Sequence, residues 1–130
     1  MYLLLNTSQD DRVSICFSDE TRWQQRDFLF TDSMNVLRAI ESVLEQTKQP
    51  LSAVRGVAVV VGKGRFTATR VAVVIGNTLA FALQIPIAAV TDAATNGLAE
   101  KIAAAPVGQL VLPTYSGGAR VGGRIVNEVC

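Results

Sequence analysis

The first thirty residues contain three short segments whose apolar pattern is that of β-strands. Residues 2–6, YLLLN, are a continuous apolar run, typical of a strand covered on both faces. In residues 13–18, VSICFS, large apolar side chains alternate with small or polar ones, which predicts a strand with one buried face. Residues 21–28, TRWQQRDF, are more polar and predict an edge strand. The three segments together predict an antiparallel meander.

After residue 31, helical and strand-like patterns alternate. The first helical segment has an apolar stripe opposite a charged side, and Pro50 is expected to end it. The later strands are short runs of small or β-branched residues, which are typical of buried parallel strands. The predicted helices span 32–48, 67–83 and 92–104, the predicted strands span 56–62, 87–90 and 109–113, and the first apolar stripe comprises Val36, Leu37, Ile40, Val43 and Leu44.

The order β-β-β-α-β-α-β-α predicts a three-layer α/β domain with a mixed five-stranded sheet. Hairpin neighbours pair antiparallel, and strands separated by a helix lie parallel through right-handed crossovers. A chain of 130 residues with 49% apolar residues is sufficient for one core. We assign residues 1–105 to this α/β domain, and 106–130 to a short strand and a glycine-rich tail.

Composition narrows the functional classes. The formal charge of +1 predicts no overall attraction to nucleic acid. With no histidine, the chain cannot use His-based acid–base catalysis. Neither Cys16 nor Cys130 suggests a disulfide framework, so we expect a reducing, cytoplasmic setting. We also expect no membrane span. We identify no catalytic and no metal-ligating residue.

The stretch GKGRFTATR joins a predicted strand to a predicted helix. Such a turn can present backbone N–H groups to an anion, but its glycine spacing matches no established phosphate-binding loop, so a tight turn is favoured over an anion site. The first strand ends at Asn6, where related metal-dependent folds carry an aspartate, and an amide supplies no charge for a metal. The candidate anion- or nucleotide-binding residues are Thr7, Gly62, Lys63, Gly64, Arg65, Thr67 and Arg70.

The helix predicted at 67–83 is apolar on two sides. Its larger residues, Val71, Val74, Ile75, Leu79 and Ala82, are expected to sit on the sheet. A second stripe then remains, formed by the small residues Ala72, Gly76 and Ala80 at intervals of four. This small-residue stripe is covered either by another helix of this chain or by a partner subunit. The candidate partner-binding residues are Thr69, Ala72, Val73, Gly76, Asn77, Ala80 and Leu83.

Residues 57–100 resemble the TsaB (YeaZ) family. Gly62, Gly64, Phe66, Thr67 and Arg70 match its G-x-G-S-F-T-G-x-R segment. The chain also departs from the family, which has serine at the position of Arg65, glycine at that of Ala68 and aspartate at that of Asn6, and whose members continue into a second half. Two further segments also match the family: the end of the helix, at Leu79, Ala80, Ile85 and Pro86, and the first strand YLLLNTS, with Thr7. The likeness covers about the first 105 residues.

The resemblance implies that residues 1–105 are half of an RNase H-like (actin-like ATPase) fold, which works as a non-catalytic scaffold in tRNA threonylcarbamoyladenosine synthesis. Its implied partners are a catalytic TsaD-like subunit, a TsaE-like ATPase and a second copy of the chain, with tRNA contacted only indirectly. It implies no cofactor of its own and allows ATP at a subunit junction, because nucleotides in this superfamily lie between two halves. The alternatives are a small metal-dependent RNase H-like enzyme and a divergent dimerisation module with another partner.

Overall fold

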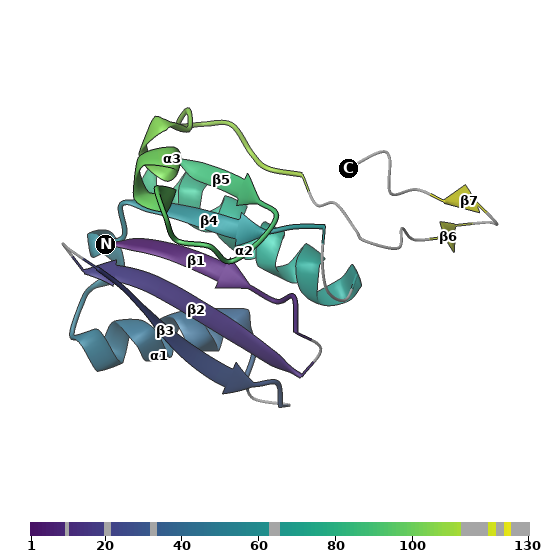
Figure 1. Cartoon of the computed structure of the whole chain (residues 1–130), viewed down its shortest axis with the longest axis horizontal. Helices are drawn as coiled ribbons and strands as arrows, with labels where there is room; N and C mark the ends of the chain where they lie inside the picture. Colours follow the sequence, from purple (N-terminus) through teal and green to yellow (C-terminus); the bar gives the residue numbers. More distant parts are fainter. Residues whose placement is uncertain are drawn as a thin grey trace.

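The computed structural model describes residues 1–9, 11–19, 22–31, 34–62, 66–112, 120–121 and 124–125. Five strands form one mixed sheet in the order β3-β2-β1-β4-β5 (Figure 1). The antiparallel meander and the parallel pairs of the later strands confirm the predicted topology. The strands are β1 (Tyr2–Asn6), β2 (Arg12–Asp19), β3 (Arg22–Leu29), β4 (Gly56–Val60) and β5 (Ile87–Val90).

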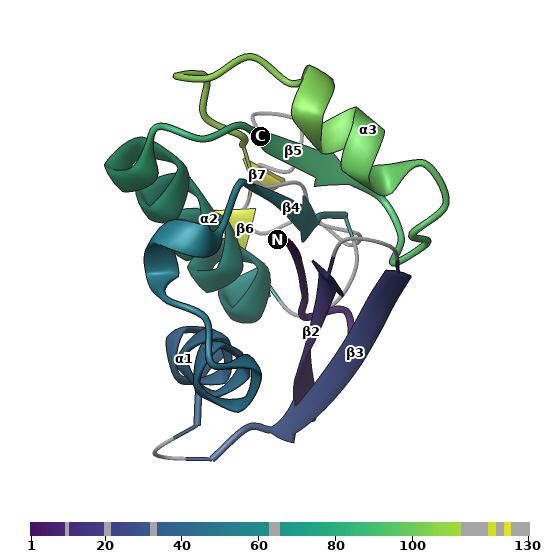
Figure 2. The ribbon, with the colours of Figure 1, turned by 90° about the vertical axis from the view of Figure 1, so that its left-hand side faces the viewer.

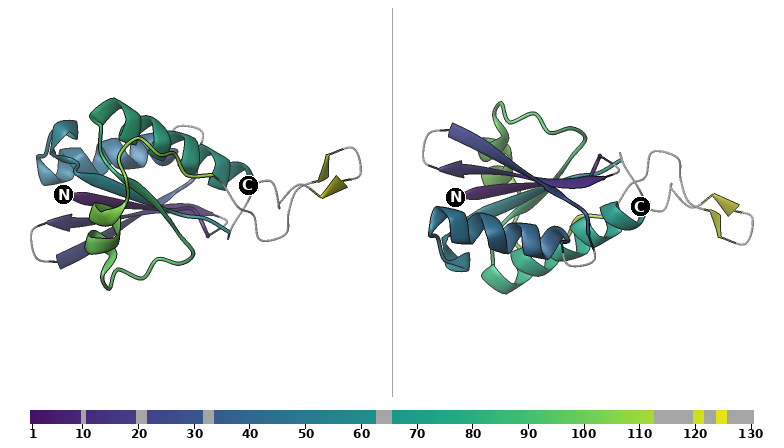
Figure 3. Two further views of the ribbon diagram at one scale, coloured as in Figure 1. Left: turned by 90° about the horizontal axis from the view of Figure 1, so that it is seen from above. Right: turned by 90° about the horizontal axis from the view of Figure 1, so that it is seen from below.

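Helices cover both faces of this sheet. α1 (Val36–Thr47) and α2 (Phe66–Leu83) lie together on one face, and α3 (Leu98–Ala104) lies on the other (Figures 2 and 3). A short 3-10 helix, η1 (Leu51–Ala53), precedes β4. The predicted three-layer architecture is therefore confirmed. Within the described part of the chain, no helix combines the length and the apolar content that crossing a bilayer requires.

The ends of α1 follow from local chemistry. The side chain of Asn35 accepts a hydrogen bond from the backbone N–H of Arg38 at 3.1 Å, so it caps the helix three residues after the predicted start. Lys48 adopts a left-handed conformation with φ of 56° and ends the helix before Pro50 is reached. Leu37 was expected in the buried stripe but is 47% exposed, and Ala39 is buried in that layer instead.

The region after β5 differs more from the prediction. α3 begins at Leu98 and not at residue 92, because Gly97 has a φ of 67° and the Asp92 carboxylate accepts the N–H of Ala94 in a turn. The strand expected at 109–113 is wrong over 109–112, which belong to no sheet. β6 (Arg120–Val121) and β7 (Arg124–Ile125) form a separate two-stranded sheet in the glycine-rich tail, where the sequence predicted no strand after residue 113. The domain boundary near residue 105 stays a prediction.

Each sheet face has its own apolar core. On the α1–α2 face the core includes Leu3, Ile15, Phe17, Val57 and Val59. The smaller core on the α3 face comprises Leu4, Cys16, Ala58, Val60, Ala88, Val90, Leu98 and Ile102. β1 and β4 contribute to both cores, which explains why their segments are continuously apolar. Cys16 is a buried free thiol, as expected, and Cys130 lies outside the described residues.

Candidate functional site

The carboxyl ends of β1 and β4 are neighbours in the sheet, and the first candidate site lies there. Asn6 Oδ1 accepts hydrogen bonds from the backbone N–H of Ser8 at 2.9 Å and from its hydroxyl at 2.6 Å. Residues 6–8 therefore form a turn that is capped by its own side chains. Because both Ser8 groups occupy the same amide oxygen, Asn6 works as part of the turn.

Thr7 is the least satisfied polar residue at this edge. It is fully buried, and its hydroxyl has no hydrogen-bond partner among the described residues. A buried unpaired hydroxyl costs free energy, so this position is unusual for a site that only forms a turn.

Of the GKGRFTATR stretch, the structure describes both ends. Gly62 has a φ of 82°, a conformation that favours glycine, and the helix begins at Phe66. Thr67 and Arg70 are both exposed on the first turns of α2. Lys63, Gly64 and Arg65 lie outside the described residues, so the anion site proposed for this loop stays a prediction.

The small-residue stripe of α2 faces this molecule's own sheet, which makes the expected orientation of the helix wrong. Thr69, Ala72, Val73 and Ala80 are at most 5% exposed, and Gly76 is buried with them. These five residues therefore have no open surface to offer a partner. The other two, Asn77 and Leu83, are half-buried at the margins of the stripe.

Close packing on β4 and β5 gives the physical reason. A Cβ added at Gly76 would lie 2.9 Å from Val59 Cγ2, 3.0 Å from Ile87 Cδ1 and 3.7 Å from Val57 Cγ1. The helix therefore approaches the strands closely, and only small residues fit between its backbone and their β-branched side chains.

Larger apolar residues of α2 consequently point away from the sheet. Val71, Val74 and Phe81 are 40%, 60% and 73% exposed, and we call these three residues the outer face of α2. Val71 and Val74 were expected to sit on the sheet, and Phe81 was not among the predicted site residues. The expectation that α2 is apolar on two sides is thus correct. Its orientation was wrong for Val71 and Val74 but correct for Leu79, which is 7% exposed and belongs to the core.

Two shallow hollows flank the N-terminal half of this outer face. One, of about 370 Å³, is lined by Thr67, Arg70, Val71, Val74 and Ile75. The other, of about 230 Å³, lies between α2 and α1 and is lined by Phe30, Asn35, Val36, Thr67, Ala68 and Val71. The two hollows and the outer face form a surface that is apolar but not flat, as expected of a docking region.

Asn77 has an intramolecular role. Its amide donates to the carbonyl of Val111 at 3.0 Å and accepts the N–H of Val111 at 3.0 Å. This pair of bonds fastens residues 110–112 along α2, next to the outer face. Asn77 is therefore engaged by this chain, and its assignment as a partner-binding residue stays a prediction.

A polar network occupies the β2–β3 surface on the α3 side. The Asp27 carboxylate accepts from Ser14 Oγ at 2.6 Å and from Gln25 Nε2 at 2.8 Å, and these bonds lower the pKa of Asp27. Burial, followed by the negative charge of Asp27, raises the pKa of Cys16. Among the described residues, no three acidic or thiol side chains lie together as a metal would require.

Comparison with known proteins gives a consistent assignment. The family model described as "TsaD: tRNA N6-adenosine threonylcarbamoyltransferase" matches residues 32–120. YeaZ from Pseudomonas aeruginosa superimposes with a TM-score of 0.63 and 31% identity, over 77% of this chain and 50% of that one. A search of the curated proteins found no significant match.

A second crystal structure, of a Pseudomonas aeruginosa protein with similarity to peptidase YEAZ, has a TM-score of 0.62 and 32% identity over 70% of this chain. The chain spans 43% and 50% of the lengths of these two structures, and so about half of the proteins that it matches. The fold shared with them is the actin-like, RNase H-like arrangement expected from the sequence.

Proposed function

Since this chain belongs to the TsaD family of tRNA N6-adenosine threonylcarbamoyltransferases, as a YeaZ (TsaB)-like member, we propose that it is a non-catalytic scaffold subunit of that tRNA-modification system. It docks through the helix layer formed by α1 and α2, either on a TsaD-like catalytic subunit or on a second copy of itself. A TsaE-like ATPase joins the assembly, tRNA is contacted only indirectly, and any ATP is bound at a subunit junction.

The observation that carries this proposal is the outer face of α2. Three large apolar side chains, Val71, Val74 and Phe81, are each at least 40% exposed along one helix. A row of this kind is costly to leave in water, and burying it against a partner is favourable. Leu37, 47% exposed on the neighbouring α1, adds to the same helix layer. By contrast, the described polar residues of the carboxyl edge, Asn6, Thr7 and Ser8, include no acid–base pair.

Co-purification with the TsaD-like protein of the same cell, using Val74→Asp, tests the docking surface. Val74 is 60% exposed, so the charge does not enter the core, but it would be buried in the proposed interface. Val107→Asp is the matched control, because Val107 is 52% exposed in the segment after α3 and lies outside the outer face. We expect Val74→Asp to weaken the complex at least tenfold and Val107→Asp to leave it unchanged.

The mass of the isolated chain in solution distinguishes the two partners. Self-association through the outer face predicts a dimer for the wild type and for Val107→Asp, and a folded monomer for Val74→Asp. A complex that forms equally well with Val74→Asp, or no complex together with a wild-type monomer, would refute docking through α2.

A further inference from the structure

A pocket of about 430 Å³ lies at the amino ends of β1 and β4, at the opposite end of the sheet from Thr7 and Gly62. Its volume falls within the range of about 300–1,000 Å³ that is usual for small-ligand sites. We call it the amino-edge pocket. Its lining residues are Met1, Tyr2, Ser18, Arg22, Trp23, Arg55, Thr95, Asn96, Gly97, Ala99 and Glu100.

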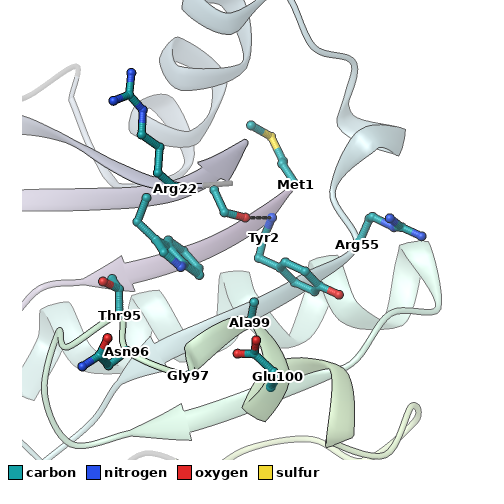
Figure 4. A pocket seen from close by; sticks show the side chains of 11 residues that line it. Met1, Tyr2, Arg22, Arg55, Thr95, Asn96, Gly97, Ala99 and Glu100 are labelled. Carbon is teal, nitrogen blue, oxygen red and sulfur yellow. Dashed lines mark hydrogen bonds between the residues drawn. The ribbon is translucent and has the colours of Figure 1, made fainter. Parts of the chain in front are cut away.

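Two aromatic rings stand on one wall of this pocket, on either side of a serine. Trp23 pairs with Ser18 across β2 and β3, and the Tyr2 N–H donates to Ser18 Oγ at 3.1 Å, the bond drawn in Figure 4. Neighbouring strands lie about 4.8 Å apart, so the two aromatic residues are about 10 Å apart across the small side chain. The row Tyr2–Ser18–Trp23 thus places the small side chain of Ser18 between two half-buried aromatic residues, and all three line the pocket.

The Tyr2 ring is fixed in place by its packing. It lies against Gly56, where an added Cβ would meet Tyr2 Cδ1 at 2.9 Å and would also collide with Ile102. Glycine at position 56 is therefore what lets the ring lie on the start of β4. A rigid aromatic wall is a prepared stacking surface, because little side-chain freedom remains to be lost when a ligand binds.

The opposite wall supplies polar groups from the segment before α3 and from α3 itself. Figure 4 shows Thr95, Asn96 and Glu100 across the pocket from Tyr2. Their hydroxyl, amide and carboxylate groups are exposed or half-buried, and together they can donate to and accept from a ring edge. A carboxylate only accepts when ionised, so Glu100 favours a ring edge that bears an amino group.

The rim is positively charged. Arg22 and Arg55 are exposed, extend outward (Figure 4) and have no ion-pair partner among the described residues. The Met1 amine donates to the Ala53 carbonyl at 2.9 Å, and its pKa is lowered first by burial and then by the charge of Arg55. Arg22 extends away from Thr95 and Glu100 (Figure 4), so the positive charge of the rim next to Tyr2 is that of Arg55 beside the Met1 amine, and this charge favours an anion there.

We propose that the amino-edge pocket binds a mononucleotide with an amino-bearing base. The base stacks between Trp23 and Tyr2, its amino group donates to Glu100, and the phosphate meets Arg55 at the rim. This site is separate from the docking surface on α2, which lies on the other face of the sheet, so either proposal can fail without the other.

Fluorescence of the full-length chain tests the proposal directly, because Trp23 is its single tryptophan. The titrants are AMP, CMP, GMP, UMP, inorganic phosphate and spermidine, with excitation at the red edge of the tryptophan band and free N-acetyltryptophanamide as the control for absorbance by the nucleotide. We expect the three amino-bearing nucleotides to quench Trp23, UMP to bind several-fold more weakly, and phosphate or spermidine to leave the emission unchanged.

Calorimetry with variants assigns the contacts. We expect Arg55→Gln to weaken CMP binding about fivefold, Glu100→Gln to reduce the preference for CMP over UMP, and Trp23→Leu to weaken binding at least tenfold. Lys101→Gln, an exposed change on α3 outside the lining, should change nothing. Absence of heat with all four nucleotides at millimolar concentration, stronger binding of spermidine than of CMP, or an unchanged affinity in Arg55→Gln would overturn the proposal.

Discussion

Gly76 offers the sharpest test of how α2 is oriented, because its substitution has opposite consequences in the two possible arrangements. If Gly76 faced solvent or a partner, alanine at this position would stabilise the isolated chain by about 1 kcal/mol, since glycine is a poor helix former. In the structure the new methyl group instead lies 2.9 Å from Val59 Cγ2 and 3.0 Å from Ile87 Cδ1. These contacts are too short to be accepted without movement.

The magnitude follows from two opposing effects. Overpacking a closed core costs about 1–3 kcal/mol, and the gain in helix propensity offsets about 1 kcal/mol of that. The Ile87 contact is with the end of a flexible side chain, which can move, whereas Val59 is β-branched and stiff. We therefore expect Gly76→Ala to lower the free energy of unfolding by about 1 kcal/mol, or the melting temperature by about 4 °C. Gly76→Leu should cost several times more and approach the whole stability of a domain, about 5–15 kcal/mol.

Urea unfolding followed by far-UV circular dichroism and by Trp23 emission measures both variants. Val74→Ala is the control within the same helix, because Val74 is 60% exposed and its truncation should change the stability by less than about 0.5 kcal/mol. A Gly76→Ala protein that is more stable than the wild type by about 1 kcal/mol would show that the stripe has room beside it, and would refute the assigned orientation of α2.

Three further predictions concern single side chains. Asn77→Ala removes both bonds to Val111 and should cost about 1–2 kcal/mol, with faster amide exchange at 110–112 and an unchanged sheet; equal exchange in both proteins would contradict this. Because the folded-state pKa of Asp27 is lowered, its contribution to stability is present above the usual aspartate pKa and is lost as the pH falls through the lowered value. Urea midpoints should therefore decrease in acid for the wild type, and less so for Asp27→Asn. Cys16 is 3% exposed and its pKa is raised, so in a Cys130→Ser background it should react with iodoacetamide only after unfolding; rapid labelling of the native protein would be inconsistent with this burial.

The sheet could be predicted from the sequence because its strands differ in pattern. The alternation in VSICFS, the continuous apolar run of YLLLN and the polar composition of TRWQQRDF reflect one covered face, two covered faces and a sheet edge. Burial dictates these patterns directly, so the strand bounds differ from the prediction by at most two residues. The start of α3 was harder to predict, since an alanine-rich segment is compatible with a helix until the backbone of Gly97 interrupts it.

The orientation of α2 could not be predicted, for a physical reason. Both sides of the helix are apolar, so hydrophobic periodicity does not distinguish them, and the usual rule that larger residues are buried was wrong for Val71 and Val74. Distance decides the matter at Gly76, where the helix comes so close to β4 and β5 that an added Cβ would already lie 2.9 Å from Val59 Cγ2. The amino-edge pocket could not be predicted from the sequence, because its lining comes from the ends of strands and from the segment before α3, and no local sequence pattern connects these parts.

The pairing of Asn77 with Val111 has a consequence for how the chain tolerates change. A carboxamide presents an N–H donor beside an acceptor oxygen, as a peptide group does. The Asn77 side chain therefore makes the two hydrogen bonds to Val111 that the backbone of a neighbouring strand could make. The Asn77 amide bonds only to backbone atoms of residue 111, so any residue except proline, which has no N–H, can make both bonds there. The sequence of this segment can therefore change during evolution without changing its position along α2, provided that Asn77 is kept.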